Sequence, residues 1–194
     1  MNKEELLETL YRTGALQQGH FLLSSGLHSD RYVQCALLLQ YPSISTKVGE
    51  ELAGLFSDLP VETVIGPAMG GIIIVYEVAR HLKKRAIFTE REQGKMVLRR
   101  GFSLEPEEPV LVIEDVITTG GSVMEVIEVC HSFRAKILGV GSIIDRSIKP
   151  LDLGVPLKSL LRLEIQTWKR EECPLCQQGI KLVKPGSREI PLSL

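Results

Sequence analysis

The sequence has little of what marks several common classes of protein. Its 194 residues include four cysteines, too few for a disulfide-stapled secreted scaffold, so we expect reduced thiols and a cytoplasmic location. No apolar run approaches the roughly 20 residues of a membrane-spanning helix, and the charged start, MNKEELLETLYRTG, is unlike a secretory signal. Lysine plus arginine (23) and aspartate plus glutamate (24) nearly balance. We therefore expect neither a membrane nor a nucleic acid as a partner.

Hydrophobic residues make up 44% of the chain, and their spacing alternates between strand-like and helix-like segments. One domain spanning residues 1–194 would bury a substantial core, and no repeat or linker divides it. Three or more strand–helix alternations predict an α/β fold with a central, mainly parallel sheet flanked by helices. Nearer the N-terminus, the pattern predicts a helix over residues 3–13, two short strands within residues 19–40 and a helix that begins at Pro42.

The stretch from Val110 to Ser122, VLVIEDVITTGGS, carries the clearest chemical signal. Val110 to Ile113 predicts a strand buried on both faces, and the apolar residues after Ser122 recur at helical spacing. A strand, a glycine-rich loop and a helix in this order aim N–H groups and hydroxyls at one point, where a phosphate fits. Glu114-Asp115 lies where open α/β sheets bind ligands. A tight turn with Ser122 capping the helix is the alternative, but the acidic pair and the hydroxyls favour phosphate binding.

A second unit of the same kind follows Val61. Val61 to Ile65 predicts a strand, Ile72 to Leu82 predicts a helix, and the loop between them reads GPAMGG. Small residues there would let backbone N–H groups approach a pyrophosphate, whereas a plain strand-to-helix turn is the alternative. The candidate pyrophosphate-binding residues are Ala68, Met69, Gly70 and Gly71.

The stretch from Glu90 to Phe102, EREQGKMVLRRGF, predicts an irregular charged loop after a strand at Ala86 to Thr89. Such a stretch is ordinarily a solvated surface loop. Its basic residues outnumber its acidic ones, and its two glycines would act as flexible points, so we favour a mobile basic lid over a pyrophosphate site. The basic residues are Arg91, Lys95, Arg99 and Arg100.

Asp145-Arg146 ends another predicted strand, Lys136 to Ile144. This charged pair would face the same rim of the sheet as Glu114-Asp115. Either its two charges form an internal salt bridge, or Arg146 recognises an anionic or carbonyl-bearing substrate.

The C-terminal region contains one Cys-x-x-Cys motif, Cys173 to Cys176. It would be half a zinc site, a redox pair or two cysteines of a turn, and without a second such motif we favour structural use. Cys35 and Cys130 lie in apolar segments typical of a core. His20 and His28 fall near the predicted turn within residues 19–40, which favours surface positions over a role as ligands.

The segment IEDVITTGGS resembles the 5-phosphoribosyl 1-diphosphate (PRPP) motif of the type I phosphoribosyltransferases. GHFLLSSGLHSDRYVQ resembles the hood strand and loop of the orotate-specific members, FTEREQGKMVLRR their catalytic loop, and IIDRS the segment of their orotate-binding arginine. The resemblance implies transfer of the phosphoribosyl group of PRPP to N1 of orotate, with release of pyrophosphate. It also implies a PRPP-binding core of about 42–148 beneath a hood formed from about 1–40 and 150–194.

The resemblance also implies a role for each matching residue. Glu114, Asp115 and Lys95 are expected to be catalytic, and Thr118 and Arg146 are expected to contact orotate. Mg²⁺ is the expected cofactor, held through PRPP rather than by protein ligands. A homodimer is expected, in which the catalytic loop reaches the neighbouring site. The residues expected to bind PRPP are Arg91, Glu114, Asp115, Val116, Ile117, Thr118, Thr119, Gly120, Gly121 and Ser122.

The sequence departs from the family pattern at three places, and two of these departures remove a lysine. Ser24 stands where many members have lysine, Met69-Gly70-Gly71 replaces Tyr-Lys-Gly, and the His-Gly-Glu-Gly run of the usual catalytic loop is absent. The basic residues between 90 and 102 would therefore supply more of the charge. Two alternatives stay open: a type I enzyme for another nucleobase, and a non-catalytic PRPP-sensing regulator. The regulator usually adds a basic DNA-binding segment, which residues 1–20 do not contain.

Overall fold

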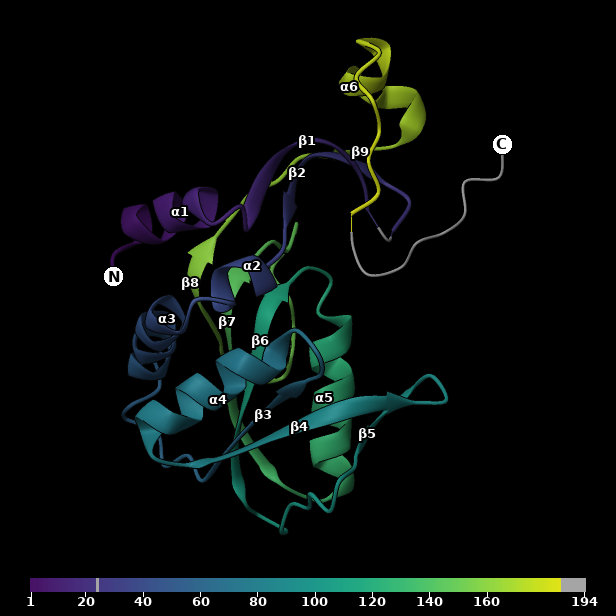
Figure 1. Cartoon of the computed structure of the whole chain (residues 1–194). Helices are drawn as coiled ribbons and strands as arrows, with labels where there is room; N and C mark the ends of the chain where they lie inside the picture. The colour runs from purple at the N-terminus through teal and green to yellow at the C-terminus, as the bar shows by residue number, and fades with distance from the viewer. Residues whose placement is uncertain (24, 186–194) are drawn as a thin grey trace.

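A six-stranded sheet forms the centre of the computed structural model, which describes residues 1–23 and 25–185 (Figure 1). The strand order is β5-β4-β3-β6-β7-β8; β4 and β5 pair antiparallel and the other neighbours pair parallel, which confirms the predicted mainly parallel sheet. Ser24 lies outside the described residues. The strands of this sheet are β3 (Thr63–Pro67), β4 (Arg85–Glu92), β5 (Lys95–Leu98), β6 (Pro109–Ile117), β7 (Lys136–Asp145) and β8 (Leu157–Arg162).

Helices cover both faces of the sheet, so β6 is buried on both sides. Leu111 and Ile113 point into the apolar cluster under α3 and α4, whereas Val110 and Val112 point into the cluster under α5. This alternation follows from the two-residue repeat of a strand, and it explains why an unbroken apolar run precedes Glu114. The three helices are α3 (Pro42–Gly54), α4 (Gly71–Leu82) and α5 (Gly121–Ser132) (Figure 1).

A second, three-stranded sheet lies across the top of the first and joins segments from both ends of the described chain (Figure 1). Its order is β1-β2-β9, with both neighbouring pairs antiparallel. This sheet is the hood that the sequence resemblance implies. Its strands are β1 (Leu16–Leu22), β2 (His28–Val33) and β9 (Thr167–Trp168), and the short helices around it are α1 (Lys3–Arg12), α2 (Ala36–Leu39), η1 (Arg170–Glu172) and α6 (Pro174–Gln177).

The predicted starts of the first helices are confirmed by their caps. At α1 the Asn2 side chain accepts the Glu5 N–H at 2.9 Å, while the Glu5 carboxylate accepts the Asn2 N–H at 3.0 Å, a reciprocal capping box. Pro42 occupies the first turn of α3, where its missing N–H costs nothing. Within residues 1–23 and 25–185, no helix has the length and apolar character needed to cross a membrane.

The charged stretch after Glu90 forms a hairpin, so the prediction of an irregular loop is wrong. β4 continues to Glu92, and β5 returns from Lys95 directly opposite it. The two-residue turn between them, Gln93-Gly94, has φ of 50° and 84°, the left-handed values that a tight hairpin turn requires. Met96 is buried in the cluster under α5, so one face of the hairpin is anchored while the charges remain outside.

The close packing of β3 on β6 predicts that position 66 accepts only glycine. A Cβ on Gly66 would overlap the carbonyl oxygen of Ile113, which belongs to the backbone and has no freedom to move aside. We expect Gly66→Ala to lower the free energy of unfolding by about 2–3 kcal/mol, measured by urea denaturation. Gly54→Ala is the control, because open space surrounds that helical position and the change should be neutral or stabilising by up to about 1 kcal/mol. Equal stability of the two variants would contradict this account of the packing.

Candidate active site

The turn between β6 and α5 places the acidic pair and the predicted phosphate loop together. Glu114 and Asp115 lie near the carboxyl end of β6, and residues 118–120 form the turn. Gly120, with φ of 79°, occupies the N-cap of α5, so the alternative in which Ser122 caps the helix is wrong. The N–H of Met124 donates to the Gly120 carbonyl at 2.9 Å, and the N–H groups before it precede the helical ladder and are available to a ligand. Both threonines of the turn are exposed.

The β3–α4 turn packs directly against the acidic pair. A Cβ on Gly70 would lie 2.9 Å from a carboxylate oxygen of Asp115, and one on Gly71 would lie 3.7 Å from Oε1 of Glu114. Met69 is 84% exposed at the tip of this turn, and the Ala68–Met69 peptide bond is cis. The structure therefore places the β3–α4 turn against the acidic pair, which immediately precedes the other predicted phosphate loop at the same rim of the sheet.

The acidic pair is buried without a balancing cation. Glu114 is 7% exposed, and burial together with the neighbouring Asp115 raises its pKa to about 9. Burial also raises the pKa of Asp115, although the Val116 N–H donates to its Oδ1 at 2.8 Å. No ion pair among the described residues includes either side chain. At neutral pH the pair therefore retains a proton, and it favours a ligand that brings hydroxyl donors or positive charge.

Arg146 stands at the same rim, one strand away. Its N–H donates to the Ile117 carbonyl at 2.8 Å, directly beside the phosphate loop. The Asp145 carboxylate accepts the Ser147 N–H at 2.8 Å, and no described residue forms an ion pair with Arg146, so the predicted alternative of an internal salt bridge is wrong. Nε of Arg146 is buried without a hydrogen-bond partner among the described residues, and burial lowers the pKa of the guanidinium. A buried cation with an unused donor favours an anionic ligand.

The hood adds Tyr32, which our reading of the sequence did not single out. Burial raises the pKa of this β2 tyrosine; the charge of Arg146 lowers it, and Asp115 raises it further. Both charged groups therefore act electrostatically on the Tyr32 hydroxyl. The neighbouring Cys35 is fully buried, as expected for a core cysteine, and its Sγ lies 4.0 Å from the Asp115 carbonyl oxygen. Tyr32 lies within the segment GHFLLSSGLHSDRYVQ, so the hood resemblance was the signal that pointed to it.

The β4–β5 hairpin holds most of its basic residues in ion pairs. Arg91 forms a bidentate pair with Glu125 of α5, a partner that the sequence did not reveal. Arg100 pairs with Glu90 at 2.7 Å and Arg99 with Glu92 at 3.5 Å. Lys95 is exposed beside the turn and belongs to no ion pair among the described residues. The hairpin projects outward beyond α5 (Figure 1), so the structure does not bring Lys95 to the acidic pair of the same chain.

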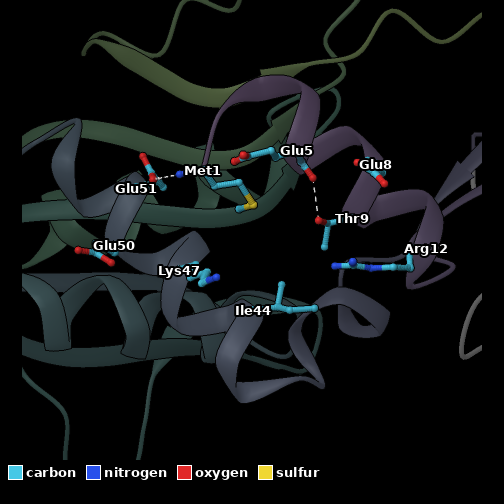
Figure 2. A pocket seen from close by; sticks show the side chains of 9 residues that line it. All are labelled: Met1, Glu5, Glu8, Thr9, Arg12, Ile44, Lys47, Glu50 and Glu51. Atoms are coloured by element: carbon cyan, nitrogen blue, oxygen red, sulfur yellow. Dashed lines mark hydrogen bonds and ion pairs between the residues drawn. The ribbon is translucent and has the colours of Figure 1, made fainter.

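A groove between α1 and α3 is a poor candidate for the same ligands. Figure 2 shows that its lining includes four carboxylates, of which Glu51 pairs with the Met1 amino group, while Thr9 bonds to the backbone of its own helix. Arg12 and Lys47 are its basic side chains. The excess of acidic groups disfavours phosphates, so we place the candidate active site at the rim of the sheet.

The geometry first defines a class of protein: an α/β protein in which two strand–loop–helix units present the predicted phosphate-binding turns and an acidic pair at one rim. Residues 38–174 match the family described as the phosphoribosyl transferase domain. An orotate phosphoribosyltransferase of Desulforamulus reducens is 56% identical over 190 residues, which cover 98% of this chain and 100% of that protein.

Solved structures agree with this likeness. The crystal structure of orotate phosphoribosyltransferase from Aeropyrum pernix superposes with a TM-score of 0.68 at 28% identity, covering 82% of this chain and 94% of that one. The Mycobacterium tuberculosis enzyme in complex with PRPP gives a TM-score of 0.66 at 22% identity, covering 83% and 96%, and shows the shared fold. The chain therefore belongs to the phosphoribosyltransferase family, and within it to the orotate phosphoribosyltransferases.

The raised pKa of Glu114 predicts how stability depends on pH. An unfolded glutamate loses its proton near pH 4.5, whereas folded Glu114 keeps it until about 9, so stability falls as pH rises between these values. Glu114→Gln removes this loss. We expect the variant to be more stable than the parent by at least about 1 kcal/mol at pH 8 and by much less at pH 5, measured by urea denaturation.

Glu128→Gln, at an exposed position of α5, controls for loss of a carboxyl as such. If Glu114→Gln and the parent differ in free energy of unfolding by the same amount at pH 5 and at pH 8, the raised pKa of Glu114 is excluded.

Proposed function

We propose that the chain transfers the 5-phosphoribosyl group of PRPP to N1 of orotate, forming orotidine 5′-monophosphate and pyrophosphate. The observation that carries this proposal is the packing of the β3–α4 turn against Glu114-Asp115, with Arg146 at the end of the adjacent strand. The family membership of the chain supports the same reaction. Anchoring, charge placement and recognition of the base are then divided among three sets of residues.

Anchoring of PRPP falls to the turn before α5. We assign the 5′-phosphate to the N–H groups and hydroxyls of Thr118 to Ser122, which lie at the N-terminus of α5 where partial positive charge favours an anion. Holding both reactants in place supplies a substantial part of the roughly 7–11 kcal/mol available from positioning. Val116 and Ile117 contribute backbone only, because they continue β6.

The acidic pair is assigned to the ribose. Glu114 and Asp115 would accept hydrogen bonds from the ribose hydroxyls, and their negative charge would favour an oxocarbenium-like centre as pyrophosphate leaves. The pair retains a proton in the ligand-free protein, and hydroxyl donors together with positive charge stabilise its ionised form. Binding of PRPP is therefore expected to lower the pKa of the pair and release that proton.

The leaving pyrophosphate is assigned to the β3–α4 turn. Gly70 and Gly71 of this turn lie beside the acidic pair, whereas the Ala68 N–H already donates to the Thr89 carbonyl at 2.7 Å. An oxygen-rich site of this kind suits Mg²⁺ carried by PRPP oxygens. When bound, Mg²⁺ would supply positive charge that neutralises the leaving group. The turn has Met69 rather than a lysine, so the protein's own mobile cation would be Lys95.

Recognition of orotate is assigned to Arg146, with Thr118 and Tyr32 beside it. Orotate carries a carboxylate that uracil and the purines lack. Arg146 has a buried Nε without a described partner, and a base with a carboxylate would satisfy that donor. This favours orotate over another nucleobase. A sensing regulator would need the same PRPP site but no base-binding cation.

The hairpin supports a homodimer. Exposed Lys95 begins β5 beside the turn of the hairpin, which projects outward beyond α5 (Figure 1), so a neighbouring subunit is the proposed recipient. The Arg91–Glu125 pair would have to exchange when Arg91 binds PRPP, at a cost of at most about 1 kcal/mol for an exposed pair. The cytoplasmic location stays a prediction.

The substrate assignment is tested by following pyrophosphate release with PRPP, Mg²⁺ and a panel of orotate, uracil, adenine and hypoxanthine. We expect release with orotate alone. Arg146→Ala should raise KM for orotate about 10-fold or more, as expected for loss of a charge-assisted bond, and leave KM for PRPP nearly unchanged. Arg12→Ala, on exposed α1, is the control. Release with a purine, or equal losses for both substrates, would contradict the assignment of Arg146.

The homodimer is tested by co-expressing Lys95→Ala and Arg146→Ala chains that carry different affinity tags. If the hairpin completes the neighbouring site, each mixed dimer contains one intact site and one doubly altered site. Random assembly should then restore about one quarter of the parental activity at low orotate concentration. A hairpin that serves its own chain predicts no restoration in isolated mixed dimers, and a monomer in sedimentation would also contradict the proposal.

A further inference from the structure

Four metal-ligating side chains meet in the hood, far from one another in the sequence. His20 lies in β1, His28 begins β2, and Cys173 and Cys176 flank the first turn of α6, so that one ligand atom from each lies within 4.8 Å of the others. His20, His28 and Cys173 are 2%, 3% and 0% exposed, and Cys176 is half-buried. The interpretation of both histidines as surface residues is therefore wrong.

The distances match those within one tetrahedral coordination sphere. Bond lengths of about 2.0–2.3 Å to zinc place its nitrogen and sulfur ligands roughly 3.3–3.8 Å apart. Here Nε2 of His20 lies 3.4 Å from Sγ of Cys173 and 3.7 Å from Sγ of Cys176, and Sγ of Cys176 lies 3.3 Å from Nδ1 of His28. Nε2 of His20 and Nδ1 of His28 are 2.8 Å apart, and metal binding would lengthen this distance by about half an ångström.

Hydrogen bonds alone do not account for this arrangement. Nδ1 of His20 lies 2.7 Å from the Ile180 carbonyl oxygen, which accepts only if that nitrogen carries the proton. Nε2 then has one lone pair, yet His28 Nδ1 and both cysteine sulfurs converge on it. One lone pair satisfies one donor. A cation at the point of convergence satisfies all four groups, and the bond to Ile180 is the outer-shell contact that orients a metal-binding histidine.

The segment that carries the cysteines has almost no apolar core of its own. Among described residues 164–185, Cys173 is the only buried one, and Ile180, Leu182 and Val183 are 44%, 38% and 47% exposed. Backbone bonds join it to β1, from the Val183 N–H to the His20 carbonyl and from the Leu22 N–H to the Val183 carbonyl, both at 2.8 Å. A short segment with so little apolar burial needs another source of stability, and a structural metal is a common one.

We propose that His20, His28, Cys173 and Cys176 bind one structural Zn²⁺, which ties the C-terminal segment to the β1–β2 hairpin of the hood. Two thiolates and two neutral imidazoles balance the charge of the ion, so the complete site is neutral and suited to burial. All four positions are filled by protein, which leaves none open for water or substrate and makes the site structural. The Cys-x-x-Cys motif is then half of a Cys₂His₂ site. The other half lies far away in the sequence, since His20 and Cys173 are 153 residues apart.

The test is the metal content of the full chain, measured by elemental mass spectrometry. The protein is purified without chelators from zinc-supplemented cells. We expect about one zinc per chain, falling at least about tenfold in Cys176→Ser and in His28→Ala. Cys130→Ala and His131→Ala are matched controls, because Cys130 lies in the core under α5 and His131 is exposed at its end. Removal of zinc by a chelator should lower Tm by about 5 °C or more, and added zinc should restore it.

Replacement by Co²⁺ in the parental chain keeps the proposal testable if the variants fail to fold. A tetrahedral site with two thiolates gives intense visible bands and a sulfur-to-cobalt charge-transfer band. Absence of these bands, zinc retained by Cys176→Ser, or a Cys173–Cys176 disulfide in the purified chain would overturn the proposal. These readouts are metal content, spectrum and stability, so their failure leaves the proposed transfer reaction untouched.

Discussion

The active-site geometry depends on how closely the β3–α4 turn approaches the acidic end of β6. Gly66 lies against the Ile113 backbone and Gly70 against the Asp115 carboxylate, so neither position has room for a Cβ. This contact sets the β3–α4 turn, which we propose for the pyrophosphate, beside the groups proposed for the ribose. It also encloses buried Glu114 and half-buried Asp115 with no ion-pair partner among residues 1–23 and 25–185, and the raised pKa values of both are the electrostatic consequence. The site therefore has a closely packed shape, but its charged groups have no ion-pair partners among the described residues.

Incomplete charge links the site to the chemistry proposed for it. Within the described part of the chain, neither acidic side chain has an ion-pair partner and the buried Nε of Arg146 has no acceptor. The turn before α5 presents N–H groups that precede the helical ladder. PRPP with Mg²⁺ and orotate would supply each missing partner. A site whose charged groups are satisfied only by both substrates favours the substrate complex over the free protein. Differential binding would come from the acidic pair, because the positive charge that it stabilises develops on the ribose only in the transition state.

The sequence predicted those parts of the candidate site whose residues lie within one short stretch of the chain. The apolar run before Glu114 and the glycines after it lie within one stretch of sequence, and so do Asp145-Arg146 and the strand before them. The β4–β5 hairpin was missed because the many charged residues of this stretch obscured the buried position of Met96 in the sequence pattern. Its turn also depends on Gln93 in a left-handed conformation, which the sequence does not reveal. The burial of His20 and His28 was missed because the residues that cover them come from a distant segment. Tertiary contacts of this kind leave no periodic trace.

The proposed charge placement requires that the Glu114-Asp115 pair retains a proton until PRPP binds. Calorimetric titration of the protein with PRPP and Mg²⁺ at pH 7.5, in buffers of different ionisation enthalpy, measures the protons released on binding. We predict release of up to about one proton per site in the parent and much less in Glu114→Gln, which has no proton to lose there. Binding of PRPP with the same proton release in both proteins would contradict the claim.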